Sequence, residues 1–145
     1  MESWLEKRDF CAIGEIGIDL HWDTSTFEIQ KEAFRTQIRW AKERGLPIVI
    51  HSRKSTQECI DVVKSEKDER LGGIFHCFGG SLEEAQQIID LGFYVGIGGV
   101  LTFKKAGLDK TMESISLDHV VLETCLLYTS PSPRDLSTSR MPSSA

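Results

Sequence analysis

A short apolar run, a loop, a Ser-x-x-Glu sequence and an amphipathic helix follow one another three times in this chain. The three Ser and Glu pairs are Ser25/Glu28, Ser55/Glu58 and Ser81/Glu84. In a capping box of this kind, the Ser side chain bonds a backbone N–H of the first helical turn and the Glu side chain bonds the N–H of the cap residue. Strands that alternate with helices pair in parallel through right-handed crossovers. The repeat therefore predicts an α/β fold with a parallel sheet.

Three of the expected helices are marked by apolar residues that recur at helical spacing and so share one face. These residues are Phe34, Ile38 and Ala41, then Ala85, Ile88 and Ile89, and more weakly Leu108, Met112 and Ile115. Gly45 and Gly92 follow the first two sets, where each helix is expected to end. Continuous apolar runs at 48–50 and 120–122 predict strands of a parallel sheet that is covered on both faces.

The length and charge of the chain limit what it can be. Its 145 residues are fewer than the about 250 of a closed (β/α)8 barrel. The formal net charge of −5 gives no overall basic field, so any phosphate must be bound by local groups. No apolar run approaches the roughly 20 residues of a transmembrane helix, and we expect a cytoplasmic protein without a membrane partner. Of the four cysteines, Cys11 and Cys77 lie in apolar strand contexts and are expected to be buried thiols in a reducing compartment.

Three side chains of metal-binding type lie at the expected carboxyl ends of strands: Glu15, His51 and His76. In a parallel barrel these ends converge on one mouth. Imidazole nitrogen together with carboxylate oxygen suits Zn²⁺, Mn²⁺ or Mg²⁺, and the sequence does not choose among them. Arg53 lies two residues beyond His51, where its guanidinium would reach a phosphate oxygen; a surface ion pair is the alternative. The pattern predicts a divalent metal site in a metal-dependent hydrolase.

Other polar and aromatic residues near these strands have simpler interpretations. His21 and Trp22 would line the substrate cleft, or else Trp22 packs against the protein and His21 is exposed, which is the interpretation we favour. Asp19 is expected to bind loop N–H groups rather than to take part in the chemistry. Gly96 and the glycines after it would let the backbone approach a substrate, but a tight bend after the strand explains them more simply. His119 is expected at a strand start, in a structural role.

At these residues the chain resembles the TatD family of metal-dependent deoxyribonucleases. The resemblance covers about residues 10–124 and is carried by Gly14-Glu-Ile-Gly-Ile-Asp19, His51-Ser-Arg53, His76-Cys-Phe-Gly79, Gly96-Ile-Gly-Gly99 and Leu122-Glu-Thr124. It implies a TIM-like barrel, a pair of divalent metal ions and hydrolysis of phosphodiester bonds in DNA. By this match Glu15 would be the carboxylate shared by both ions, His51 and His76 would complete one metal site, and Arg53 would assist with phosphate.

Two departures from the family pattern accompany this resemblance. The family has a His-x-His pair on its first strand, and no His precedes Glu15 here. The family has an Asp ligand after Leu-Glu-Thr, whereas this chain has Cys125, whose thiolate is itself a possible Zn²⁺ ligand. We therefore expect an internal fragment, roughly strands three to seven of a (β/α)8 barrel, with a domain at 1–125. The Ser/Pro-rich segment 126–145 is predicted to be a disordered tail that is not native to the domain.

The predicted function is metal-dependent hydrolysis of DNA by the intact protein, with DNA as the partner and with no protein partner evident. We expect little or no activity from the 145 residues alone. Two alternatives stay open. One is ester or amide hydrolysis on the same metal scaffold, because a fold does not determine a reaction. The other is a non-catalytic remnant that binds a metal ion.

Overall fold

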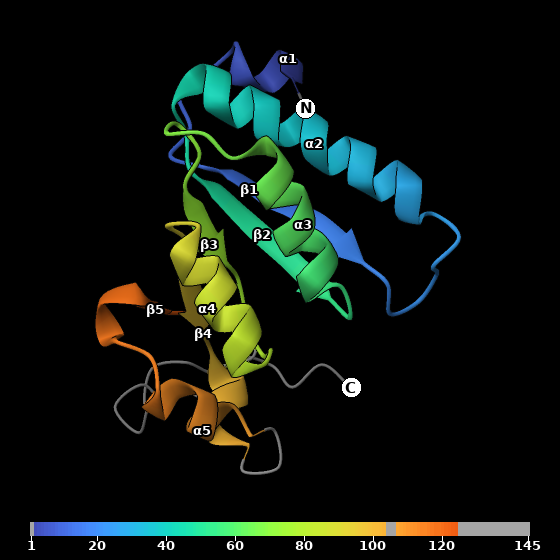
Figure 1. Ribbon diagram of the computed structural model, residues 1–145. Helices are drawn as coiled ribbons and strands as arrows, with labels where there is room; N and C mark the ends of the chain where they lie inside the picture. Colours follow the sequence, from blue (N-terminus) through green and yellow to red (C-terminus); the bar gives the residue numbers. More distant parts are fainter. Residues whose placement is uncertain (1, 104–106, 125–145) are drawn as a thin grey trace, which may run out of the picture.

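The computed structural model describes residues 2–103 and 107–124, and within them five strands form one parallel sheet in the order β1-β2-β3-β4-β5 (Figure 1). The strands are β1 (Ile13–Asp19), β2 (Ile48–Arg53), β3 (Gly73–Phe75), β4 (Tyr94–Ile97) and β5 (Val120–Leu122). Each strand pairs in parallel with the next, and a helical crossover connects them. The predicted α/β fold with a parallel sheet is confirmed. Cys125 and the expected tail at 126–145 lie outside the described residues.

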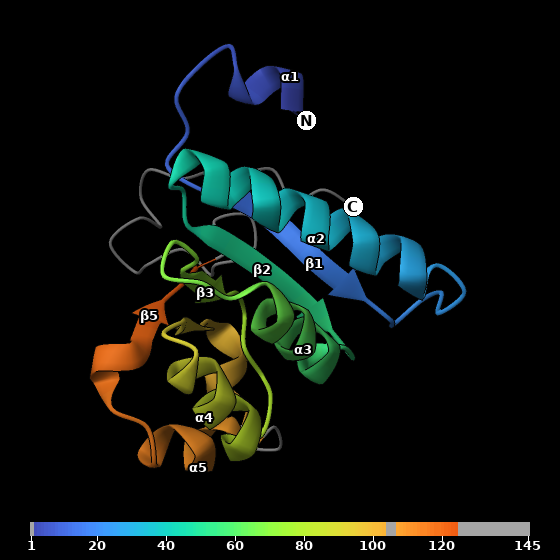
Figure 2. The same ribbon diagram turned by 45° about the horizontal axis from the view of Figure 1, so that its top comes forward.

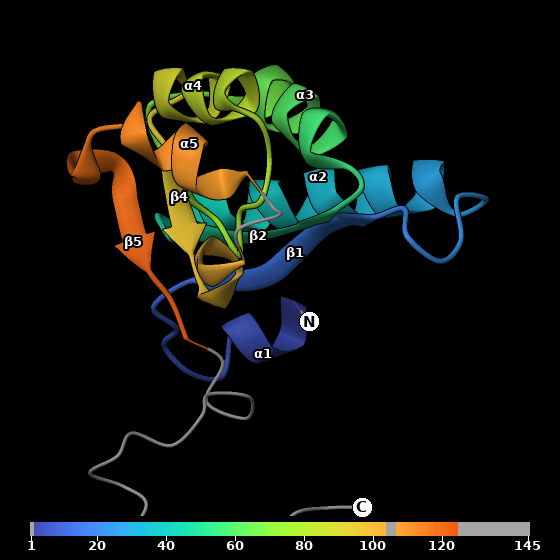
Figure 3. The ribbon, with the colours of Figure 1, turned by 90° about the horizontal axis from the view of Figure 1, so that it is seen from below.

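The sheet is curved, and the longer helices cover one of its faces. The helices are α1 (Glu2–Leu5), α2 (Phe27–Arg44), α3 (Thr56–Glu66), α4 (Leu82–Asp90) and α5 (Leu108–Glu113), with 3₁₀ turns η1 (Gly99–Thr102) and η3 (Leu117–His119). Figures 2 and 3 show α2, α3 and α4 side by side over the convex face, whereas the short α1 lies on the opposite side of β1. No helix in the described ranges is long and apolar enough to cross a membrane.

The core lies between the sheet and these three helices. Phe34, Ile38 and Ala41, the predicted apolar face of α2, are fully buried. Each fully buried Phe or Ile side chain contributes about 1.5–3 kcal/mol relative to exposure. Gly45 adopts the left-handed conformation (φ 63°) that ends α2, as its position predicted. The helical periodicity was thus enough to orient α2 on the sheet.

Of the three predicted capping boxes, only the one at α4 forms. The backbone N–H of Glu84 donates to Ser81 Oγ at 3.2 Å, and Ser81 N–H donates to Glu84 Oε2 at 2.7 Å. The prediction is wrong at α2, which has Thr26 as its cap residue and no side-chain cap bond. It is also wrong at α3, where Ser55 makes no side-chain cap bond and its buried hydroxyl donates to the carbonyl of Ile18. Its oxygen accepts from the Arg53 backbone N–H at 3.1 Å, so that the hydroxyl joins β1 to the end of β2.

Two predictions of burial are wrong. The expected strand at 120–122 forms β5, but Leu122 is 82% exposed. Within the described residues β5 is hydrogen-bonded only to β4, so one of its edges and much of its surface face solvent. Cys11 and Cys77 are exposed because both lie in connecting segments, before β1 and after β3, rather than inside strands. Cys59, on the inner face of α3, is the buried thiol of the described part of the chain.

Candidate metal centre

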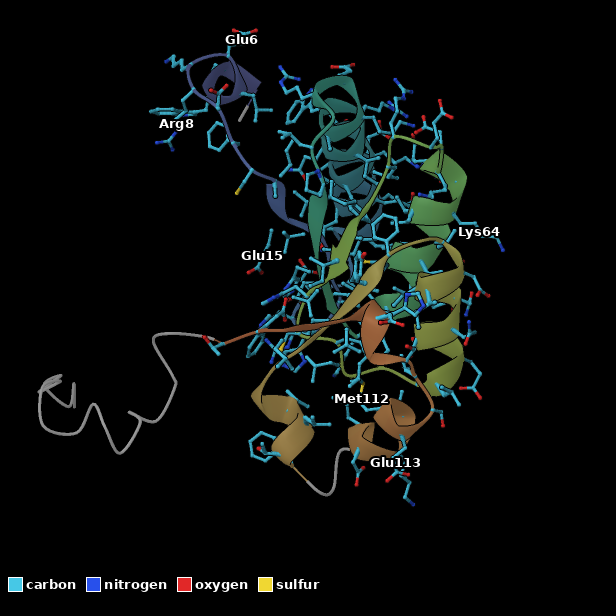
Figure 4. The ribbon with its side chains drawn as sticks, turned by 90° about the vertical axis from the view of Figure 1, so that its left-hand side faces the viewer. Glu6, Arg8, Glu15, Lys64, Met112 and Glu113 are labelled. Carbon is cyan, nitrogen blue, oxygen red and sulfur yellow. The ribbon has the colours of Figure 1, made fainter. Side chains whose placement is uncertain are left out.

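Glu15 lies at a bulge in β1 that turns its side chain away from the core. The pairing with β2 runs from Gly14 opposite Val49 directly to Ile16 opposite Ile50, so Glu15 is the extra residue. The bulge allows Ile13 and Ile16, three residues apart, both to be buried. The Glu15 side chain is 51% exposed, on the opposite side of the sheet from the α3 side chain Lys64 (Figure 4). The bulge therefore places a carboxylate on the face that α2, α3 and α4 leave open.

Two histidines flank this carboxylate. His51 Nδ1 lies 3.7 Å from Glu15 Oε2, and His76 Nε2 lies 3.6 Å from Glu15 Oε1. The structure thus brings the three predicted residues together, one oxygen facing each imidazole. The expectation that all three end their strands is wrong in detail. His76 directly follows β3, but β1 continues past Glu15 to Asp19 and β2 continues past His51 to Arg53.

A glycine opposite His51 makes the close approach of the two strands possible. Gly17 pairs with His51 in the parallel ladder. Its φ of +144° is rarely adopted by other residues, and a Cβ added to Gly17 would overlap the carbonyl oxygen of His51. Gly17 therefore fixes how closely β1, which carries Glu15, approaches the backbone of His51.

The other nitrogen of each imidazole contacts a second carboxylate. His51 Nε2 lies 3.1 Å from Asp19 Oδ2, and His76 Nδ1 lies 2.9 Å from Glu123 Oε1. An ionised carboxylate only accepts hydrogen bonds, so in a neutral imidazole these nitrogens carry the hydrogen. The nitrogens that face Glu15 are then left with their lone pairs. This pairing of carboxylate and histidine is typical of the residues that orient metal ligands.

Asp19 has two roles, one predicted and one missed. Its Oδ1 accepts a hydrogen bond from the His21 backbone N–H at 2.9 Å, as expected of a residue that binds loop N–H groups. Its Oδ2 also contacts His51, which the sequence did not predict. The His21 backbone N–H, and then the His51 imidazole and Arg53, hold the pKa of Asp19 below its ordinary value of 3.8. Asp19 is therefore ionised at neutral pH and is suited to accept from His51.

Glu123 is the residue of this cluster that sequence reasoning missed. Its side chain is 15% exposed, and besides the contact with His76 its Oε2 accepts from the Cys77 backbone N–H at 2.8 Å. A Cβ on Gly96 would overlap this carboxylate, so Gly96 makes room for Glu123 rather than for a bend or a substrate. The available signal was a charged residue directly after an apolar strand, with a glycine in the preceding strand.

Arg53 and Trp22 lie beside the cluster, at the ends of β2 and β1. Arg53 is the last residue of β2, and its guanidinium carbon lies 5.7 Å from the centre of the Trp22 ring. Trp22 is 81% exposed, so the interpretation in which it packs against the protein is wrong. The ring of His21 stands edge-on to it, with centroids 4.5 Å apart. His119 lies at the end of η3, before β5, as expected of a residue at a strand start.

The donor chemistry of the cluster fits a divalent ion. Two ligand atoms each about 2.1 Å from a tetrahedral ion are about 3.4 Å apart, close to the separations of 3.6 and 3.7 Å found here. Between residues 2 and 124, leaving aside 104–106, no three His, Cys, Asp or Glu side chains are placed so that they could hold a metal ion as they stand. The carboxylate and the two lone-pair nitrogens are all acceptors, so a cation between them would stabilise the arrangement. An imidazole proton or a metal ion meets this requirement.

Comparison with known proteins adds independent information. The family model described as TatD related DNase matches residues 1–143. The uncharacterized metal-dependent hydrolase YabD of Bacillus subtilis is 46% identical over 123 residues, which are 84% of this chain and 48% of that protein. The 3'-5' ssDNA/RNA exonuclease TatD of Citrobacter koseri is 34% identical over 131 residues, 89% of this chain and 50% of that protein.

A solved structure agrees with these relatives. The crystal structure of YJJV, a TatD homologue from Escherichia coli K12, superposes with a TM-score of 0.79 and 33% sequence identity. The match covers 85% of this chain and 48% of that one. The chain thus spans about half the length of the relatives that it matches. The chain belongs to the TatD family of metal-dependent hydrolases.

Proposed function

We propose that Glu15, His51 and His76 bind a divalent metal ion in a TatD-type nuclease that hydrolyses phosphodiester bonds of DNA. One observation carries the proposal. Glu15 lies between two imidazole nitrogens at 3.6 and 3.7 Å, and the opposite nitrogen of each ring contacts a carboxylate. A carboxylate flanked by two imidazoles, each of which contacts a second carboxylate, is typical of metal ligands and the residues that orient them. The ion would be Mg²⁺, Mn²⁺ or Zn²⁺, and the bridging role of Glu15 between two ions is part of the proposal.

Each residue then has a defined task. Asp19 and Glu123 hold the protons of His51 Nε2 and His76 Nδ1, and so keep the other nitrogens free to bind the ion. When bound, a divalent ion supplies a Lewis acid that stabilises negative charge on a phosphoryl group. Arg53 binds a phosphate oxygen of the substrate at the end of β2. The chain carries a net charge of −5, so no overall basic field attracts the phosphate backbone. In the proposal this local guanidinium supplies that attraction.

The choice of substrate and the larger fold belong to the same proposal. The Citrobacter relative is named as an exonuclease of single-stranded DNA and RNA, which favours a single-stranded nucleic acid. We infer that the five-stranded sheet is part of a TIM-like (β/α)8 barrel, roughly its strands three to seven. The sequential order of the strands and their curvature support this inference (Figure 3). The concave face, where Glu15 lies, would then face the barrel axis.

The first experiment measures metal binding by titration calorimetry of Mn²⁺ into the 145-residue chain. We expect Glu15→Gln to weaken Mn²⁺ binding at least about 100-fold. Substitution of a residue that only contacts a metal ligand typically weakens binding about 10- to 100-fold. The matched control is Glu113→Gln, because Glu113 is an exposed carboxylate on α5 that lies away from Glu15 (Figure 4). Equal Mn²⁺ affinity in Glu15→Gln and the wild type would show that Glu15 is not a ligand of the ion and would refute the proposal.

The second experiment tests hydrolysis, with the chain in excess over end-labelled single-stranded DNA and with Mn²⁺ present. We expect at most slow cleavage, since this chain has Cys125 where the family has an Asp ligand, and we expect Glu15→Gln to abolish any cleavage that is detected. Mn²⁺ binding without any cleavage would favour the non-catalytic alternative. Metal-dependent hydrolysis of an ester or amide substrate, but not of DNA, would favour the other.

A further inference from the structure

Trp22 is 81% exposed although its loop is held in place by hydrogen bonds. The loop after β1 is anchored where Leu20 N–H donates to the carbonyl of Arg53 at 2.9 Å and where His21 N–H donates to Asp19 Oδ1 at 2.9 Å. A Trp side chain offers about 150–250 Å² for burial. The loop is ordered, yet the ring stays in water and its burial does not stabilise the fold. This indicates that the ring binds a ligand.

The surroundings of the ring are polar. The residues that follow Trp22 are Asp23, Thr24 and Ser25, and all three are exposed. The loop closes on itself where Ser25 N–H donates to Asp23 Oδ1 at 2.8 Å. A docking surface for another protein is normally a contiguous apolar patch, whereas the exposed residues that follow Trp22 are polar. A single aromatic face in polar surroundings suits one flat ligand group instead.

The ring is also coupled to the candidate metal centre. Asp19, which contacts His51, precedes Trp22 by three residues, and three residues of chain span at most about 11 Å. The guanidinium of Arg53 lies 5.7 Å from the ring centre, within the range of a cation–π contact. An aromatic face, a guanidinium and the contact of Asp19 with His51 therefore lie close together near the ends of β1 and β2.

We propose that Trp22 is a stacking platform for one base of a single-stranded nucleic acid and that Arg53 binds the phosphate beside that base. The proposal rests on the proposed nuclease function and adds how the strand is held next to the metal centre. Every base has a π face, so stacking of this kind tolerates any sequence. Loss of one such contact weakens binding about 5- to 150-fold.

The test measures binding of a fluorescein-labelled oligothymidine strand by anisotropy, with EDTA present so that cleavage and metal binding do not contribute. We expect Trp22→Ala to weaken binding about 10-fold, and Trp22→Phe, which keeps a π face, to lose less than about 3-fold. The matched control is Trp4→Ala, because Trp4 is 56% exposed and also has a cation over its ring, Lys7 at 5.0 Å. We expect this control to bind as the wild type does.

An abasic strand of the same length separates stacking from phosphate binding. We expect it to bind the wild-type chain as weakly as the oligothymidine binds Trp22→Ala, with no further loss in that variant. Equal affinities of Trp22→Ala and wild type for oligothymidine would overturn the proposal. An equal loss on both strands, or no binding of either strand to the wild type, would overturn it as well.

The result also separates this proposal from the nuclease function. Cleavage that depends on Glu15 but has the same KM in Trp22→Ala would leave the function standing and would refute the stacking platform. Binding that depends on Trp22, together with no metal-dependent cleavage, would keep the platform and refute the nuclease. Trp22 is mostly in solvent, so neither of its variants removes a core contact.

Discussion

Replacing Gly96 by Ala tests whether the Glu123 carboxylate is held in place by the empty space over β4. A Cβ at position 96 would overlap the Glu123 carboxylate, so the side chain must leave its position. Glu123 then loses its contacts with His76 Nδ1 at 2.9 Å and with Cys77 N–H at 2.8 Å. The three atoms nearest to the added Cβ all belong to the Glu123 carboxylate.

The expected magnitude follows from these two contacts. A hydrogen bond to a charged group contributes about 1.5 kcal/mol at the low end of its range, so two contribute about 3 kcal/mol. Replacing Gly by Ala returns about 0.5 kcal/mol by restricting the unfolded chain. We therefore expect Gly96→Ala to lower the free energy of unfolding by about 2–3 kcal/mol and to weaken Mn²⁺ binding about 10- to 100-fold, through the freed His76.

Urea unfolding followed by circular dichroism measures the first quantity, and calorimetry measures the second. The control is Gly99→Ala, since an added Cβ at Gly99 meets no atom within 4 Å; it should change stability by less than about 0.5 kcal/mol. A double-mutant cycle with Glu123→Ala completes the design. If Gly96→Ala acts through Glu123, the two effects are not additive. Additive effects, or a wild-type stability for Gly96→Ala, would refute the reasoning.

Three further predictions address other parts of the fold. Gly17→Ala should lower the free energy of unfolding by at least about 2 kcal/mol in the same urea experiment, since its Cβ would meet the His51 carbonyl at a φ of +144°. Hydrogen bonds from Arg70 hold the pKa of Asp68 below 3.8. The ionised pair therefore stabilises the fold above that pH, and the stabilisation is lost as pH falls through the lowered pKa. Asp68→Asn should reduce the acid dependence of Tm below about pH 4. Burial raises the pKa of Cys59 to about 12, so mass spectrometry after iodoacetamide treatment at pH 8 should find this thiol unmodified in the folded chain.

The parts of the fold that the sequence predicted are those set by local spacing. The apolar face of α2, with Phe34 and Ile38, follows from a helical period that neighbouring residues define among themselves. The capping box at Ser81 is local in the same way. Ser55 shows the limit of such reasoning, because its hydroxyl is taken by Ile18, 37 residues away. Whether a Ser caps its own helix depends on which other donors and acceptors the rest of the chain brings to its hydroxyl.

The same distinction between local and long-range information applies to the candidate metal centre. The types and rough positions of Glu15, His51 and His76 could be read from the sequence, and the structure brings them together. The bulge that turns Glu15 outward depends on the register between β1 and β2, which no local pattern specifies. The contact of Glu123 with His76 joins residues 47 apart and depends on β3, β4 and β5 lying in order. Long-range pairing was therefore what sequence reasoning could not supply.

Asp19 connects the two proposals made for this site. One of its oxygens contacts the imidazole of His51, and the other accepts the backbone N–H of His21, next to Trp22. A single carboxylate thus contacts both the imidazole that we propose as a metal ligand and the loop that carries the proposed stacking ring. The end of the same strand is further tied to β2 by the bond between Leu20 and Arg53. A site that must hold a phosphodiester close to a metal ion needs this kind of rigid connection, because misplacement of a substrate by about 1 Å can cost 100-fold in rate. We therefore infer that Asp19, which the sequence assigned to loop structure, positions the base relative to the ion.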